Sequence, residues 1–384
     1  GGDGVMAKLG EICAFQSGGT PSKNKPEYFG GEIPWISTTA LNGGKINEAD
    51  AVAWITPKAI RESAAKIVPA NSIMIGTRVG IGKVAINTVE MSTSQDVISL
   101  INIDEDKWYK PYLCKLLLSK KDYFNSQARG ATIKGIKIDV VANIDVPEID
   151  YTTQRKVAAT LNKIDTLIFL RKQQLAKLDE LVKARFVEMF GDISNSRKVP
   201  MQDVCKIITD GTHQPPKFVL SGIPFLFVSN IVTNEIHYDA EKFISEETYN
   251  ELIKRTPIEV GDVLLSTVGS YGHPAVVKEN KPFCFQRHIA YLKPNNSVVN
   301  SEYLRCAILS TDLQRQIDES VKGIAQKTLN LSEIRKLRLP LPSLSLQNQF
   351  AAFVERIDQQ KQTVQQSLEK LELMKKALMQ EYFG

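Results

Sequence analysis

The sequence predicts an α+β protein built as a tandem duplication, in which a globular unit followed by a long helix occurs twice. The first observation is an amphipathic stretch from Thr152 to Phe190 that contains no proline or glycine. The second is a repeat of that stretch from Ser345 to Phe383, 193 residues later. The third is that short β-like runs separated by glycine- and proline-rich turns precede both stretches in the same order.

The first long stretch has the pattern of a helix seam. Its apolar residues recur at intervals of four and three, which is heptad spacing, at Val157, Leu161, Ile164, Ile168, Leu175, Leu178, Val182 and Met189. We expect Thr152 to cap the first turn with its side-chain oxygen and Gly191 to end the helix in a left-handed conformation. A helix of this length is about 58 Å long.

The duplication extends to individual residues, as in Gln154 and Gln347, Asp165 and Asp358, and the Phe-Gly pair that ends each copy. It predicts four segments. They are a first globular domain at residues 5–148, a first long helix at 149–192, a second globular domain at 197–341 and a second long helix at 344–383.

Composition describes an ordinary globular protein of 384 residues, with 43% hydrophobic and 24% charged residues. No apolar run has membrane-spanning length, and no signal-peptide pattern is present. Five scattered cysteines without a Cys-x-x-Cys pair predict reduced thiols and a cytoplasmic protein. The net charge of +5 permits binding to nucleic acid if the cations gather on one face.

The loops of the two globular units differ while their strands agree. In the first unit two predicted strands, 72–75 and 84–86, flank the glycine-rich basic turn 76–83. We expect Gly18-Gly19-Thr20-Pro21 to correspond to Asp210-Gly211-Thr212-His213, and Gln95-Asp96 to Gln286-Arg287-His288. Two copies of one fold therefore carry different surfaces, as two readers of unlike targets would.

The sequence lacks the recognisable groups that catalysis would require. The sequence contains no Asn/Asp-Pro-Pro-Tyr/Phe motif, the turn 76–83 fails as a phosphate loop because Val84 replaces the Ser/Thr, and the four histidines lack metal spacing. No nucleophile, base and orienting group occur together in a recognisable motif. We expect a chain that is not an enzyme by itself and that binds no metal.

In its duplicated organisation and in the signature before each long helix, the chain resembles the specificity (S) subunit of type I restriction-modification systems. The matching signature is a Leu-Pro step before the second long helix and a glutamine a few residues into it, at Leu339-Pro340 and Gln347, with a weaker first copy at Val146-Pro147 and Gln154. The Gly18–Pro21 loop and the turn 76–83 also look like those of the family's target-recognition domains.

The resemblance implies a non-catalytic subunit that binds double-stranded DNA. Each target-recognition domain would read one half of a bipartite, asymmetric site, and the two long helices would pack as an antiparallel coiled coil that fixes the spacer. The same helices would dock two modification methyltransferase subunits, and restriction subunits would complete an ATP-dependent endonuclease. S-adenosylmethionine, ATP and Mg would belong to those partners, with no cofactor in this chain and no membrane contact.

Cations, amides and histidines in the loops are the candidates for contact with DNA, because Arg and Lys pair with guanine, Gln with adenine, and other cations with phosphate. In the first domain these are Thr20, Lys23, Arg78, Lys83, Gln95, Arg129 and Lys134. In the second they are Thr212, His213, Gln214, Lys217, Asn230, Tyr271, His273, Gln286, Arg287, Lys322 and Lys327.

Two alternatives remain open from the sequence. One is a DNA methyltransferase or nuclease with an unrecognised site, and the other is a scaffold whose duplicated domains bind only proteins. The sequence also leaves open whether the partner system is type I or one in which methylation and cleavage share a polypeptide.

Overall fold

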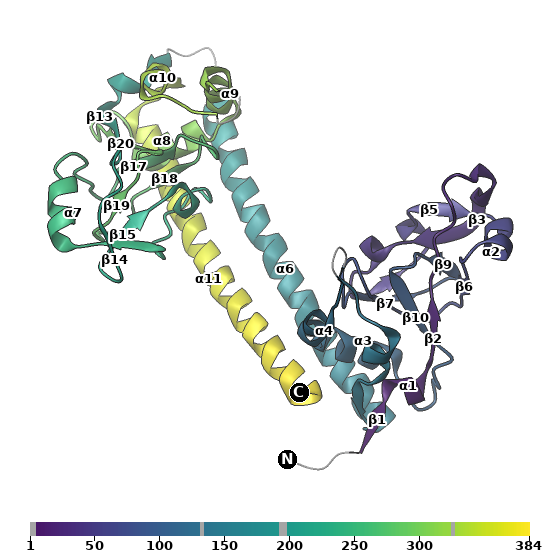
Figure 1. The fold of residues 1–384 in the computed structure, drawn as a ribbon. Coiled ribbons are helices and arrows are strands. Elements are labelled where there is room, and N and C mark those ends of the chain that lie inside the picture. Colours follow the sequence, from purple (N-terminus) through teal and green to yellow (C-terminus); the bar gives the residue numbers. More distant parts are fainter. Residues whose placement is uncertain (1–4, 131–133, 192–197, 324–326) are drawn as a thin grey trace. The chain divides into compact units, whose positions relative to one another are not determined.

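A computed structural model describes residues 5–130, 134–191, 198–323 and 327–384. The chain forms two compact units (Figure 1). Unit 1 consists of Gly1–Lys172 and Gln366–Gly384, and unit 2 consists of Gln173–Gln365. The two boundaries lie 193 residues apart, so each unit holds one globular domain and one half of each long helix.

Unit 1 begins with a mixed α+β domain. Its elements are β1 (Met6–Lys8), α1 (Leu9–Ile12), β2 (Ala14–Ser17), β3 (Phe29–Ile36), β4 (Lys45–Ile46), β5 (Ala53–Ile55), α2 (Pro57–Glu62), β6 (Ile67–Val68), β7 (Ile73–Gly76), β8 (Val84–Asn87), β9 (Met91–Thr93), β10 (Val97–Ile101), α3 (Lys110–Ser119), α4 (Lys121–Gln127), α5 (Ile138–Ala142) and β11 (Asp145–Pro147). One sheet has the order β2-β10-β7-β8-β4, a second β5-β3-β9-β6, and β1 pairs with β11.

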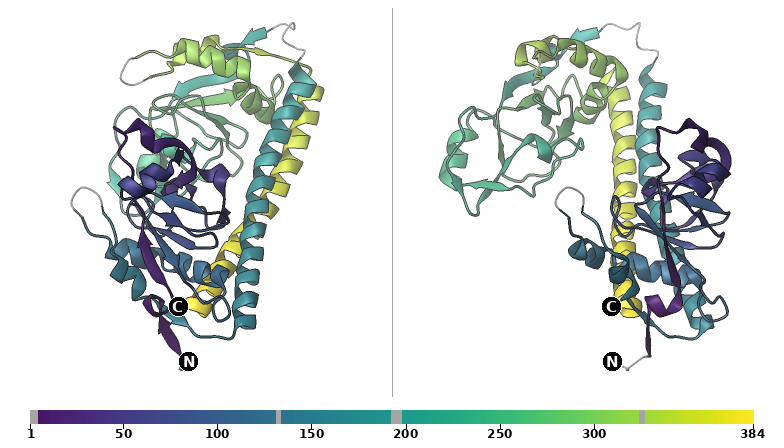
Figure 2. Two further views of the ribbon diagram at one scale, coloured as in Figure 1. Left: turned by 90° about the vertical axis from the view of Figure 1, so that its right-hand side faces the viewer. Right: turned by 45° about the vertical axis from the view of Figure 1, so that its right-hand side comes forward.

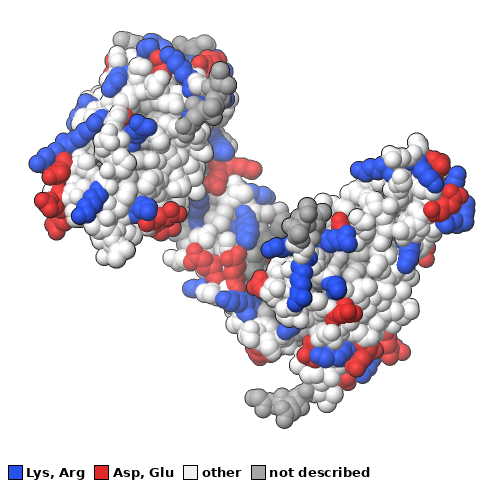
Figure 3. Space-filling model, in the orientation of Figure 1, with Lys and Arg blue, Asp and Glu red and all other residues white. Residues whose placement is uncertain are grey.

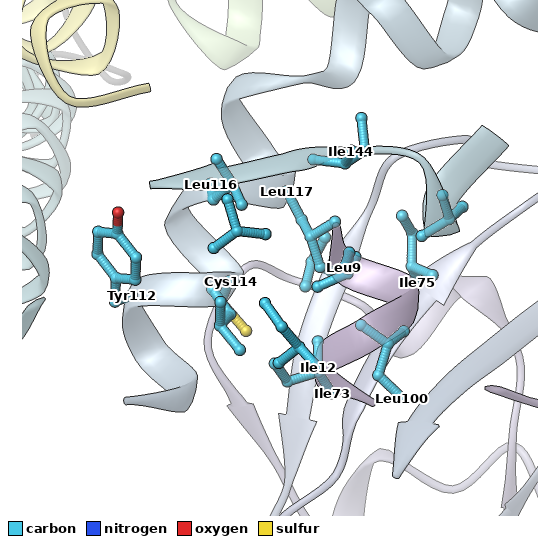
Figure 4. Close-up of a cluster of buried hydrophobic side chains, with 14 of the residues drawn as sticks. Leu9, Ile12, Ile73, Ile75, Leu100, Tyr112, Cys114, Leu116, Leu117 and Ile144 are labelled. Carbon is cyan, nitrogen blue, oxygen red and sulfur yellow. The ribbon is translucent and has the colours of Figure 1, made fainter. Parts of the chain in front are cut away.

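The core of unit 1 lies between the five-stranded sheet and the helices. Strands β7 and β8 pair antiparallel and are fully buried, as the apolar runs on either side of the glycine-rich turn predict. Figure 4 shows Ile73, Ile75 and Leu100 of the sheet facing Leu116 and Leu117 of α3. This packing holds the ends of β2, β7 and β10 rigidly in place, and the polar loops begin at those ends.

Unit 2 repeats the architecture. Its elements are β12 (Lys198–Pro200), β13 (Cys205–Asp210), β14 (Phe218–Val219), β15 (Ile223–Leu226), β16 (Lys242–Ile244), α7 (Glu246–Leu252), β17 (Val263–Ser266), β18 (Pro274–Val276), β19 (Cys284–Phe285), β20 (Ile289–Pro294), α8 (Ser301–Ile308), α9 (Thr311–Ser320), α10 (Leu331–Lys336) and β21 (Arg338–Pro340). The sheet β13-β20-β17-β18 matches β2-β10-β7-β8, and the parallel pair β15–β19 matches β3–β9.

The long helices are α6 (Tyr151–Phe190) and α11 (Leu344–Phe383). They run antiparallel within each unit, as Figure 2 shows. In unit 1 Asp165 pairs with Lys375 at 2.6 Å and Lys172 with Glu372 at 3.1 Å. In unit 2 Lys361 pairs with Asp179 at 2.9 Å. Leu178, Ile357 and Val364 of the heptad seam pack together, which confirms the coiled-coil prediction.

The expected helix ends were wrong in detail. The cap of α6 is Asp150, which accepts a hydrogen bond from the backbone N–H of Thr153 at 3.0 Å. Ser343, 193 residues later, accepts the equivalent bond from Leu346 at 3.4 Å. A carboxylate one residue before the helix thus replaces Thr152 as the cap. Gly191 does not have a positive φ, because the helix tightens into a last 3₁₀ turn there.

A buried glutamine near the start of each long helix joins that helix to the globular domain of the same repeat. Gln154 accepts from the N–H of Tyr109 at 2.8 Å and donates to the carbonyls of Lys107 and Ile149 at 3.0 and 2.9 Å. Gln347 repeats all three bonds with Asn300, Val298 and Pro342 at 2.8, 3.2 and 2.9 Å. The glutamine in the sequence signature therefore fixes the helix to the loop before α3 or α8.

Each long helix ends against the other repeat's domain. Phe383, at the end of α11, joins the core of unit 1 and lies 5.3 Å from the ring of Tyr112. Phe190, at the end of α6, joins the core of unit 2 and lies 4.9 Å from the ring of Tyr303. Both compact units are therefore built from residues of both repeats.

Candidate nucleic-acid interface

The first loop cluster comprises residues 18–20, 77–83, 94–97 and 129–136, of which 131–133 lie outside the described residues. Backbone bonds join its four segments: Gly18 donates to Val97 at 3.0 Å, Thr77 to Asp96 at 2.8 Å, and Ile136 to Thr77 at 2.8 Å. The N–H of Gln95 also donates to Oγ1 of Thr20 at 3.4 Å. Loops far apart in sequence thus meet on one surface.

This surface is basic and exposed. Thr20, Arg78, Lys83, Gln95, Arg129 and Lys134 all carry exposed side chains. Arg78 and Arg129 line a cleft of about 710 Å³ together with Lys137 of the loop before α5. Figure 3 shows Lys and Arg side chains gathered on unit 1 beside α4. Cations at this density suit a polyanion.

The second loop cluster comprises residues 211–213, 267–273, 286–289 and 322–329, of which 324–326 lie outside the described residues. Its backbone bonds repeat those of the first: Gly211 donates to Ile289 at 3.2 Å, Thr267 to His288 at 2.9 Å, and Leu329 to Thr267 at 2.8 Å. The two clusters therefore have the same backbone scaffold and different side chains.

These bonds correct the expected correspondence between the loops. Because Gly18 and Gly211 donate to equivalent strand residues, Thr20 corresponds to His213, so His213 does not replace Pro21. Because Thr77 and Thr267 donate to Asp96 and His288, those two acceptors correspond, and Gln95 corresponds to Arg287. Sequence comparison placed Thr20 opposite Thr212, one residue out of register, because insertions and deletions of one to three residues separate the equivalent loops.

The same bonds identify three residues that the candidate set omitted. Val268 occupies the place of Arg78, since it follows Thr267 as Arg78 follows Thr77. Asp96 lies 3.8 Å from Arg78, oxygen to guanidinium nitrogen, and His288 occupies the place of Asp96. The correct internal alignment is the signal that would have found them.

Two histidines of the second cluster, His273 and His288, have lowered pKa values. Burial lowers the pKa of His273, and burial together with the charge of Arg287 lowers the pKa of His288. Nε of Arg287 lies 3.4 Å from Nε2 of His288, which suits an unprotonated acceptor nitrogen. A neutral imidazole has one donor and one acceptor nitrogen, and in His288 the acceptor Nε2 faces Arg287.

Some candidate residues for DNA contact are buried, bonded to other side chains or placed on neighbouring loops. Asn230 is buried, accepts from Phe227 at 2.9 Å and donates to His237 at 3.1 Å, so its amide stabilises a turn. Tyr271 lies in the second cluster and donates to Asp318 at 2.9 Å. The backbones of Gln286 and Thr212 pair at the edge of that cluster, and Gln214 and Lys217 are exposed on the loop that follows. Lys23 is exposed on the loop that follows Thr20 in the first domain.

The type I restriction modification DNA specificity domain matches this sequence twice, over residues 3–180 and 194–373. The chain belongs to this family. Its two specificity domains correspond to the two repeats, and sequence-specific recognition of DNA, without catalysis of its own, is the role that family membership gives it. Among the residues that the structure describes, no group of three His, Cys, Asp or Glu side chains could hold a metal ion, and no helix could span a membrane.

Similar proteins include two specificity subunits and a solved S subunit. The MjaIX specificity subunit of Methanocaldococcus jannaschii is 25% identical over 92% of this chain and 86% of its own length. The EcoR124I/EcoR124II specificity subunit of Escherichia coli is 31% identical over 41% of this chain and 40% of its own. The crystal structure of an S subunit from M. genitalium matches the fold with a TM-score of 0.60 at 15% identity, over 100% of this chain and 96% of that one.

Proposed function

We propose that each loop cluster of this specificity subunit reads one half of a bipartite, asymmetric DNA site. One observation carries the proposal: two surfaces share the same hydrogen-bonded scaffold but differ in the side chains that they present. A scaffold held constant positions both surfaces in the same way, while different side chains select different bases. A single symmetric site would need two equal surfaces.

The helices α6 and α11 set the distance between the two half-sites in this proposal. A helix of 40 residues is about 60 Å long, which equals about 18 base pairs at about 3.4 Å each. The outward faces of the same helices dock two modification methyltransferase subunits, and restriction subunits join them. S-adenosylmethionine, ATP and Mg²⁺ are held by those partners, and the complex acts in the cytoplasm. A solved structure of complex assembly in a type I system, 19% identical with a TM-score of 0.62, shares the fold.

Selection of bound sequences from random duplex DNA tests the proposal. The full chain is used both alone and co-expressed with its methyltransferase. We expect two short, unlike motifs separated by a fixed gap. The variant Arg78→Ala should lose base preference in one motif only. The variant Arg287→Ala should lose base preference in the other motif only. A single motif, or a gap that varies freely, would contradict the proposal.

A further inference from the structure

The duplication supplies an internal alignment of the two loop clusters, residue against residue. The equivalent backbone bonds of Thr77 with Asp96 and of Thr267 with His288 fix the register in the turn. The pairing of Arg129 with Gly135, matched by that of Lys322 with Thr328, fixes it in the basic segment. Positions can therefore be sorted by whether their chemistry is the same or different in the two repeats.

Two positions keep a positive charge. Arg129 corresponds to Lys322, and Lys134 corresponds to Lys327. All four side chains are exposed, and within the described part of the chain none of the four forms an ion pair within 4.0 Å. The exchange of Arg for Lys preserves a charge but not the planar fork that recognises guanine. A phosphate needs only the charge, so these positions suit the DNA backbone.

Two neighbouring positions change their chemistry completely. Where the first cluster has the ion pair of Arg78 and Asp96, the second has Val268 and His288. Arginine donates two bonds to guanine and a carboxylate accepts from cytosine, whereas valine can only contact an apolar group such as the thymine methyl. A neutral imidazole can both donate and accept.

The exchange leaves the formal charge of the pair unchanged. Arg78 and Asp96 carry opposite charges that sum to zero, and Val268 with a neutral His288 also sums to zero. Attraction to phosphate depends on charge, so the two pairs contribute equally little to it. The exchange therefore changes the groups offered to base edges while it leaves the summed charge of the pair unchanged.

We propose that Arg78 with Asp96, and Val268 with His288, determine base preference at equivalent places of the two half-sites, while Arg129, Lys134, Lys322 and Lys327 hold phosphates. This inference rests on the proposed function, because it assigns roles within the two reading surfaces. It makes the two residue classes separable by experiment, since one class alters sequence preference and the other alters dependence on salt.

The test transplants one pair into the other cluster. The double variant Arg78→Val with Asp96→His is prepared as the full chain with its methyltransferase, beside the reciprocal variant Val268→Arg with His288→Asp. We expect one or two positions of a single half-site to change and the original sequence to bind about 5- to 100-fold more weakly. The slope of log affinity against log salt concentration should stay constant.

The matched control replaces the two cations of the first cluster that are assigned to phosphates. Arg129→Ala with Lys134→Ala should leave both motifs unchanged, weaken all sequences equally and reduce the salt slope by about 2. Unchanged motifs in both transplants would overturn the assignment of the base-reading pairs, and an unchanged salt slope in the control would overturn that of the cations. If the wild-type chain itself yields no pair of motifs, the proposed function fails instead.

Discussion

The ammonium group of Lys115 in α3 lies 2.7 Å from a carboxylate oxygen of Asp165 in α6, and Lys375 of α11 lies 2.6 Å from the other oxygen. One carboxylate thus joins the domain of unit 1 to both long helices. Burial alone would raise the pKa of Asp165, but hydrogen bonds and charge from the two lysines outweigh it and hold the pKa below its ordinary value. In unit 2 the equivalent Asp358 pairs with Lys278, so both repeats attach their helix by a carboxylate.

Replacing Asp165 by Asn should destabilise unit 1. The side chain of Lys115 is only 6% exposed, so the change leaves a nearly buried cation without its partner. We expect the free energy of unfolding of unit 1 to fall by about 2–3 kcal/mol. Hydrogen exchange of the α3 and α6 amides in the full chain measures this loss of unfolding free energy. Glu188→Gln, which removes an exposed ion pair with Arg185, is the control and should cost under about 0.5 kcal/mol.

The same pair predicts a dependence on pH. A carboxyl group with a depressed pKa in the folded state stabilises that state above the unfolded pKa of about 4, and this contribution is lost as pH falls through the folded value. The difference in unfolding free energy between wild type and Asp165→Asn should therefore be constant near pH 7 and shrink below about pH 4. A difference that grew in acid would contradict this account.

Gln347→Leu should loosen the start of α11. The change leaves the N–H of Asn300 and the carbonyls of Val298 and Pro342 without their partner. Three unmade bonds at a buried site should cost about 2–4 kcal/mol, seen as faster hydrogen exchange in α8 and in the first turns of α11. Gln349→Leu is the matched control, since Gln349 is exposed on the same helix. Equal rates of hydrogen exchange in Gln347→Leu and Gln349→Leu would contradict this prediction.

Gly18→Ala should disturb the first loop cluster. A Cβ at Gly18 would lie 2.1 Å from the carbonyl oxygen of Ser94, so the loop that carries Thr20 must move. We expect weaker selection of one half-site and an unchanged second motif, measured by the same sequence selection. Gly44→Ala is the control, because its nearest neighbour is the flexible end of Asn42 at 3.3 Å. Loss of both motifs in Gly18→Ala would indicate a general folding defect instead.

Lengthening both long helices should lengthen the spacer. One heptad inserted after Lys172 and one after Gln365 fall at the unit boundaries, so neither compact unit is interrupted. Seven residues add about 10 Å of helix, equal to about three base pairs. Sequence selection should return both original motifs with a longer gap. An unaltered gap would contradict a spacing role for the helices.

The sequence was sufficient for the architecture and insufficient for the details of the loops. Heptad spacing and the 193-residue repeat predicted α6 and α11 to within a residue or two, because a buried seam of 40 residues leaves little freedom of register. The segment 8–15 has the apolar composition of a short β-like run but contains the short helix α1, since four residues carry too weak a periodic pattern. The cap of α6 lies two residues before the expected position because Asp150 and Thr152 both have suitable side chains.

The site residues show why the loops could not be aligned from sequence. Thr20 matches His213 at an offset of 193 residues, Thr77 matches Thr267 at 190, and Asp96 matches His288 at 192. Each change of offset is an insertion or deletion in a loop, where no periodic pattern restricts the chain. Only the strand-end hydrogen bonds restore the register, and they depend on the folded sheet.

Because Phe383 completes the core of unit 1, the order of synthesis differs from the order of completion. Unit 2 is one continuous segment, Gln173–Gln365, and all of its residues are synthesised before the last stretch of unit 1 is made. Unit 2 can therefore fold first, although it is translated second. A premature stop within residues 366–384 would consequently damage the first globular domain, and under the proposed function its effect would be loss of recognition of the half-site assigned to that domain.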